Sequence, residues 1–407
     1  MDLKMKYQYT YFIYPYLIEK NKYKTYFYNL LKNPKCKLKL FDRKKDVGID
    51  KYFLPELKEK MFWSLNKKQS AIKQYEEMDK KMQAVLLAKQ ACNIFEYELG
   101  GDVPGKIGEK GGIFFDITKV EIVCFDTGVC FLLLKTNLTE NQQFSDVLNF
   151  NYKFRDINSK IEHTKQYETI KIQTEKLNNM QNFPEFIKEI VGNNIQAKQI
   201  NLDTDRLITY SYVCLDQSSW NENTDIDLLE REFEKYRTIK PAGEQIQDIR
   251  KNELYSYQEK YLYYGFTNDS TVLLTCDNNI KNYTTLPFQY ENEQLYHFIF
   301  HLYKKIYLKK LNYEFQKTKK LELVKTKFLE FAKRDWIYEI TNDEIGRILE
   351  KHYEEEQNLQ NSFEKLKQQY DLLYKNYEIH KSEKRSKWVI AIILAMIVLD
   401  LITIFLF

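Results

Sequence analysis

The sequence has few of the residues that build disulfide frameworks or zinc sites. Its 407 residues include only six cysteines and five histidines, and no two cysteines have CxxC spacing. The formal net charge of +4 is close to balance, so the chain lacks the strong basic excess typical of nucleic-acid-binding proteins. We therefore expect reduced thiols, no metal, no cofactor and no nucleic-acid partner.

Catalytic motifs are also missing. The sequence contains neither a GxxxxGK[ST] phosphate loop nor an HExxH zinc motif. The triplet Asp126-Thr127-Gly128 resembles that of aspartic proteases, but it occurs once and is followed by Val129. Because residues typical of strands flank this triplet, we interpret it as a hairpin turn. We expect the protein not to be an enzyme.

Two histidines lie one helical turn apart. His297 and His301 have the spacing of two metal ligands, but no nearby carboxylate pattern accompanies them. The sequence therefore favours partly buried histidines in an aromatic helix.

The longest apolar run is residues 388–407, WVIAIILAMIVLDLITIFLF. A helix of this length spans about 30 Å, the thickness of a bilayer core, so the run predicts a transmembrane helix. Basic residues precede it, among them Lys384 and Lys387, and Trp388 stands at the expected interface. Because excess Lys and Arg mark the cytoplasmic side of a span, we expect a single-pass protein of the inner (plasma) membrane with most of the chain in the cytoplasm. The N-terminus does not resemble a signal peptide.

Asp400 is the only charged residue within that run. A carboxylate inside a span is costly and usually faces other helices or water. Met396 and Thr403 share its helical face, so we expect these three residues to face a helix bundle or a pore.

The predicted fold class is an α/β (or α+β) cytoplasmic domain followed by a long, coiled-coil-like helical stalk and a C-terminal transmembrane helix. The expected boundaries are 1–288 for the cytoplasmic sensor domain, 289–387 for the stalk and 388–407 for the span. Residues 342–407 are expected to form one helix, because they contain no proline and only one glycine. A heptad seam from Ile345 to Tyr377 predicts packing either against the chain's own helix at 291–334 or against further copies.

Four residues are candidates for binding an anionic ligand. Lys106 and Lys110 lie in the glycine-rich segment GGDVPGKIGEKGG, which we interpret as a mobile loop or a lid. Asn151 and Arg155 lie in FNYKFR, where aromatic, amide and guanidinium groups would suit a nucleotide. Ordinary helix packing with solvated charges is the alternative for this second segment.

The layout resembles CorA-like membrane proteins of the two-transmembrane GxN group. The resemblance is carried by the order of domains and by the long helix at 341–407. The segments Tyr52-Phe53-Leu54-Pro55 and FNYKFR are similar to divergent members associated with type III CRISPR systems, in which a nucleotide messenger acts on the cytoplasmic domain. The Gly-Met-Asn tripeptide and the second span of that group are missing, so the resemblance implies no Mg²⁺ transport.

These patterns lead to two functional hypotheses. The first is a homo-oligomeric membrane effector or channel-like protein of antiviral defence, whose cytoplasmic domain senses a ligand such as a nucleotide second messenger. Its C-terminal helices would then open or disrupt the lipid bilayer. The second is a tail-anchored scaffold that binds a protein partner and uses its anchor only for location.

Overall fold

The computed structural model describes residues 3–108, 112–139, 143–156, 170–173, 180–192, 206–246, 261–317 and 321–406. Some side chains within these ranges are not described, including all those from residue 400 onward.

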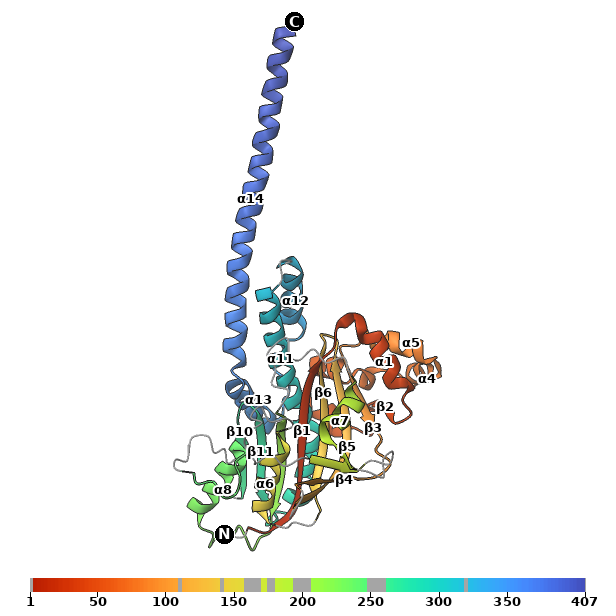
Figure 1. The fold of residues 1–407 in the computed structure, drawn as a ribbon, viewed down its shortest axis with the longest axis vertical. Helices are drawn as coiled ribbons and strands as arrows, with labels where there is room; N and C mark the ends of the chain where they lie inside the picture. Colours follow the sequence, from red (N-terminus) through yellow and green to blue (C-terminus); the bar gives the residue numbers. More distant parts are fainter. Residues whose placement is uncertain are drawn as a thin grey trace.

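The body is built on one mixed sheet of eleven described strands (Figure 1). The strand order is β10-β11-β9-β1-β6-β5-β4-β7-β8, and β3 joins β2 to β5. All the described pairs are antiparallel except β9 with β11. The strands are β1 (Met5–Leu17), β2 (Cys36–Leu38), β3 (Cys92–Tyr97), β4 (Val103–Ile107), β5 (Ile113–Phe125), β6 (Val129–Leu138), β7 (Ile170–Gln173), β8 (Met180–Asn182), β9 (Ile208–Leu215), β10 (Leu262–Phe266) and β11 (Ser270–Cys276).

Strand β1 lies between β6 and β9 and is apolar on both faces. Tyr9, Tyr11 and Ile13 belong to one core cluster, whereas Phe12 and Tyr16 belong to the other. Alternate side chains of a strand point to opposite faces, so a strand covered by helices on both sides needs apolar residues at nearly every position.

Short helices surround the sheet. On the face of Phe12 the core includes residues of α1, α5, α6, α7 and α8, and on the face of Tyr9 it includes residues of α2, α3 and α11. The short helices of the body are α1 (Tyr23–Lys32), α2 (Val47–Tyr52), α3 (Pro55–Met61), α4 (Gln69–Glu77), α5 (Lys80–Leu87), α6 (Phe144–Phe154), α7 (Phe183–Val191), α8 (Ile226–Thr238), α9 (Lys281–Thr284) and α10 (Leu286–Gln289).

The C-terminal part is helical and leads away from the sheet. It comprises α11 (Leu295–Lys317), α12 (Leu321–Arg334), α13 (Glu344–Glu356) and α14 (Leu359–Leu406). Figure 1 shows α11 beside the sheet, α12 folding back along α11, and α14 projecting far beyond the body. The single helix expected over 342–407 is thus two helices. They are separated at Asn358, whose φ of 50° is left-handed and incompatible with a continuous helix.

The heptad seam packs within the chain. Leu359, Phe363 and Leu366 of α14 are buried in the same core cluster as residues of α11 and α12, and Tyr370 packs against that cluster. The phenyl ring of Phe363 stacks on the Trp336 indole, and the Tyr370 ring contacts the Phe328 ring. This part of the seam therefore packs against the chain's own helices, the first of the two predicted alternatives.

The predicted transmembrane helix is contradicted. Among the residues that the structure describes, no helix is both long and apolar enough to cross a bilayer. The predicted fold class is therefore wrong at its C-terminal end, although its mixed α/β body is found. The predicted plasma-membrane location and the channel interpretation, which depended on this span, are overturned with it.

Several local predictions also need correction. Apolar residues at helical spacing predict a long amphipathic helix over residues 71–99, but this range contains most of α4 and all of α5, followed by β3. The glycine-rich segment expected as a loop contains β4, which pairs with β5 and β7. The apolar pattern of the first hundred residues predicts mainly helix, but these residues include the central strand β1.

Candidate functional site

The most distinctive polar group in the described chain lies where α11 meets α13. His297 and His301 are one turn apart on α11, which follows a π-helical turn at Tyr290–Gln294. Glu350 belongs to α13, whose start is fixed by the Asp343 carboxylate accepting a hydrogen bond from the Gly346 N–H at 2.8 Å. A side-chain cap of this kind satisfies an otherwise unpaired N–H and so defines the start of the helix.

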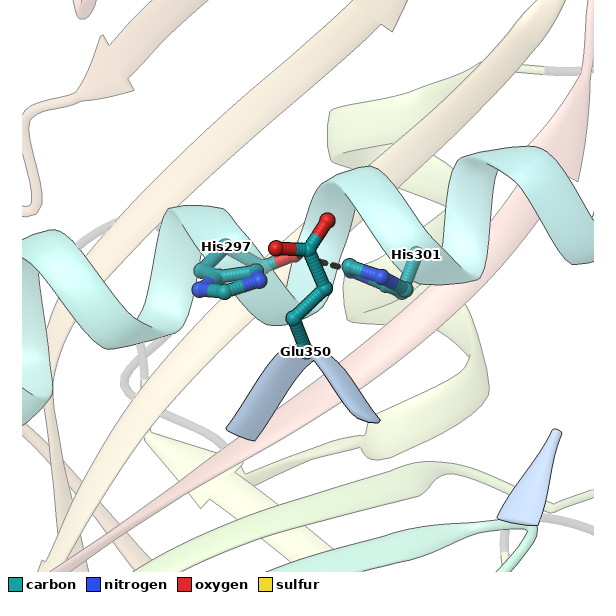
Figure 2. A group of neighbouring side chains, drawn as sticks. All are labelled: His297, His301 and Glu350. Carbon is teal, nitrogen blue, oxygen red and sulfur yellow. Dashed lines mark hydrogen bonds between the residues drawn. The ribbon is translucent and has the colours of Figure 1, made fainter. Parts of the chain in front are cut away.

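Figure 2 shows the Glu350 carboxylate reaching from α13 toward the two imidazole rings on α11. One potential ligand atom of each residue lies within 4.8 Å of those of the other two. Both histidines are fully buried and Glu350 is nearly so. The three side chains therefore face one another inside the protein.

Each imidazole uses one nitrogen and leaves the other unused. His301 Nδ1 lies 3.2 Å from the His297 carbonyl oxygen, and His297 Nδ1 lies 2.9 Å from the Tyr52 hydroxyl. The Nε2 atoms of both rings and Oε1 of Glu350 are buried without a hydrogen-bond partner among the described residues. Buried polar atoms in this state are uncommon and call for an explanation.

Burial controls the charges in this group. It lowers the pKa of His297 to about 3 and the pKa of His301 well below the usual value, in each case with help from the nearby Lys304 ammonium. Burial also raises the pKa of Glu350 to about 7, although Lys304 acts in the opposite direction. Both histidines are therefore neutral near pH 7, the form in which imidazole binds metals.

Lys304 completes the surroundings of the group. Its side chain is fully buried, and burial lowers its pKa to about 8 against the effects of Glu354 and Glu350. Its ammonium group donates a hydrogen bond to the Ile337 carbonyl at 2.7 Å and lies 3.9 Å from the Glu354 carboxylate. The Lys304 ammonium is thus directed toward the Ile337 carbonyl and the Glu354 carboxylate.

The histidine spacing was visible in the sequence, but the carboxylate was not. Glu350 lies on another helix and becomes a neighbour only because α13 packs against α11 through Leu349 and Tyr353. A search for nearby carboxylates in the sequence could not find it. Both histidines lie on a helix as expected, but they are fully rather than partly buried.

The predicted ligand-binding residues have different surroundings. Asn151 is buried, where it accepts a hydrogen bond from Thr10 Oγ1 at 3.0 Å and donates one to Ser211 Oγ at 3.2 Å. Its amide thus holds α6 on strands β1 and β9. The Lys106 ammonium on β4 lies 5.3 Å from the centre of the Phe114 ring.

Arg155 follows α6 and is the strongest of the four candidates. Its Nε is buried without a hydrogen-bond partner among the described residues. Burial, and to a smaller extent the positive charge of the nearby Arg206, lowers the pKa of its guanidinium. Lys110 lies outside the described residues. Binding of a nucleotide by these residues stays a prediction.

The residues predicted to line a pore lie on α14. Lys384, Lys387, Trp388 and Met396 are all exposed along the projecting helix. The side chains of Asp400 and Thr403 lie outside those described.

The Asp126-Thr127-Gly128 triplet forms the turn between β5 and β6, as predicted. A cavity of about 230 Å³ opens beside it. The Asp126 carboxylate forms an ion pair with Arg334 at 2.8 Å, and Arg334 Nε also donates to Asp335 at 2.9 Å. Asp126 thus connects the turn to the end of α12, a structural role.

The apolar part of α14 is the second notable surface. We call residues 388–398 the apolar segment; every side chain in it is exposed. Trp388 has 72% of its surface exposed, and Leu394 has 58%. Soluble monomers rarely expose continuous apolar patches larger than a few hundred Å², so a surface of this kind marks an interaction site.

No known protein family, curated protein or solved structure matches this chain.

Proposed function

We propose that the protein is a non-enzymatic interaction protein that assembles into homo-oligomers through the apolar segment of α14. The observation that carries this proposal is the exposure of that segment at the far end of a helix that leaves the body (Figure 1). Burying apolar surface contributes about 25 cal/mol per Å², so covering this segment gives a large driving force for association.

The two halves of α14 play different parts in this proposal. One face of the first turns of α14 is covered by the chain's own helices, because Leu359, Phe363 and Leu366 are buried. The apolar segment is exposed in every direction around the helix. A helix that is apolar all round is stable only when it is enclosed.

Further copies of the chain are the partner that we favour. Arg385 and Lys387 precede the apolar segment, so parallel helices would place like charges side by side. Antiparallel helices place those charges at opposite ends of the contact and keep the two bodies apart. Several antiparallel copies, packed as a helix bundle, cover more of each segment than one pair does.

The test is the mass of the full-length protein in aqueous buffer, measured by sedimentation equilibrium. We expect an oligomer. The triple variant Ile390→Lys, Ile393→Lys, Ile397→Lys should dissociate to monomers, with a dissociation constant at least tenfold higher. Leu329→Lys, which alters an exposed leucine on α12, is the matched control and should leave the oligomer intact.

Circular dichroism would verify that both variants are folded. A monomeric wild-type protein at micromolar concentration would refute the proposal. So would a chain that fails to associate with itself but attaches to phosphatidylcholine vesicles through the apolar segment, because the partner would then be lipid. An oligomer that survives the triple substitution would also contradict it, since the contact would lie elsewhere.

A further inference from the structure

His297, His301 and Glu350 have the composition of a transition-metal site. Two imidazoles and one carboxylate form the protein ligand set of many zinc sites and of non-haem iron sites. Among the described residues, this is the one group of three His, Cys, Asp or Glu side chains whose ligand atoms lie close enough together to bind a single ion. We propose that these three residues bind one divalent transition-metal ion, with Zn²⁺ as the first candidate.

The hydrogen bonds of the imidazoles support this assignment. If Nδ1–H of His301 donates to the His297 carbonyl, the lone pair lies on Nε2, the nitrogen without a partner. Metal-binding histidines usually donate their second N–H to a carbonyl or another oxygen in this way. The Tyr52 hydroxyl stands in the same position for His297.

The unpaired atoms provide the second, independent argument. Two Nε2 atoms and one carboxylate oxygen are buried in one small region without partners in the described part of the chain. A bound cation would provide a partner for all three atoms at once. Because nitrogen provides two of the three ligands, the site suits Zn²⁺ better than Mg²⁺ or Ca²⁺, which prefer oxygen.

Neighbouring charges are compatible with a cation. The Glu350 carboxylate of the group and the nearby Glu354 carboxylate lie on α13, and the Lys304 ammonium lies on α11. Two carboxylates offset one ammonium, and that ammonium is held by the Ile337 carbonyl. The ion would join α11 to α13, the helix that precedes α14, so we expect its role to be structural.

The first experiment uses the full-length protein, freed of metal with a chelator and dialysed against Zn²⁺. Elemental analysis should find one zinc per chain, and zinc should raise the melting temperature of the metal-free protein. Glu350→Gln and His301→Gln keep the approximate size of each side chain and should weaken zinc binding at least tenfold. His352→Gln, which changes a histidine of α13 whose ring stacks on Phe266, is the matched control and should bind zinc like the wild type.

A second measurement keeps the test valid if a variant does not fold. Co²⁺ added to the metal-free wild-type protein should give visible absorption bands typical of a site with nitrogen and oxygen ligands. No stoichiometric zinc, no cobalt bands, or full zinc binding in folded Glu350→Gln and His301→Gln would each overturn the proposal.

Discussion

The Trp336 indole and the Phe363 ring stack with their centres 4.2 Å apart and their planes 17° from parallel. Both side chains are buried, and the Phe328 ring of α12 also packs on Phe363. This stack fastens the base of α14 to the segment that connects α12 with α13. The projecting helix therefore depends on a few aromatic contacts at its lower end.

We predict that Phe363→Ala lowers the free energy of unfolding by about 3–5 kcal/mol, the usual cost of removing a buried aromatic side chain. Urea denaturation followed by circular dichroism measures this change. Leu372→Ala, also on α14 but with 65% of its surface exposed, should change the stability by less than about 0.5 kcal/mol. Equal losses in the two variants would show that the stack does not anchor α14.

A buried ion pair connects α3 with the end of α12. The Lys60 ammonium and the Asp335 carboxylate are in contact, and the Tyr303 hydroxyl donates to the same carboxylate at 2.7 Å. Asp335→Ala leaves the Lys60 charge buried without this partner, so we expect a loss of about 3–5 kcal/mol in unfolding free energy. The measurement is again urea denaturation.

The double variant Lys60→Met, Asp335→Leu removes both charges together. It should be more stable than Asp335→Ala, because no unpaired charge is left in the core. The single variants Lys60→Met and Asp335→Leu complete the cycle, and a double variant whose loss equals the sum of these two single losses would show that the two groups are not coupled.

The sequence predicted many elements but misplaced those with an unusual environment. Runs of β-branched and aromatic residues predict strands at 207–214, 261–266 and 271–276, and β9, β10 and β11 begin and end within one residue of these ranges. Strand β1 was missed because its tyrosines face two cores at once and produce no simple alternation. The helix break at Asn358 has no proline or glycine to signal it.

The candidate metal group could be predicted only in part. The spacing of His297 and His301 indicated one shared helical face, but the third ligand depends on how α13 packs against α11. The C-terminal prediction relied on the apolar composition of residues 388–407 alone, whereas no helix among the described residues is both long and apolar enough to cross a bilayer. Single-chain patterns report local structure well and contacts between distant helices poorly.

Gly128 in the Asp-Thr-Gly turn should not tolerate a side chain. Its φ is +99°, and an added Cβ would lie 2.5 Å from the Ile18 carbonyl oxygen. We predict that Gly128→Ala lowers the unfolding free energy by about 1–3 kcal/mol through backbone strain. Gly243→Ala is the control: nothing lies within 4 Å of its added Cβ, so thermal denaturation should reveal no comparable loss.

Glu293 should make the stability of the protein depend on pH. Burial, with a smaller effect of the Asp343 charge, raises the pKa of Glu293 from 4.5 to about 7. The folded protein therefore holds this proton more tightly than the unfolded chain does. The resulting stabilisation is complete below pH 4.5 and is lost as the pH rises through 7.

We predict that Glu293→Gln, which cannot ionise, reduces the loss of stability between pH 5 and pH 8 by about 1–2 kcal/mol relative to the wild type. Urea denaturation at both pH values, with a chelator present, measures the difference. Glu350, whose pKa is also raised to about 7, contributes the same slope to both proteins and cancels in the comparison. Parallel pH profiles would mean that the Glu293 carboxyl group is as well solvated in the folded protein as in the unfolded chain, since only a difference in proton affinity between the two states produces a slope.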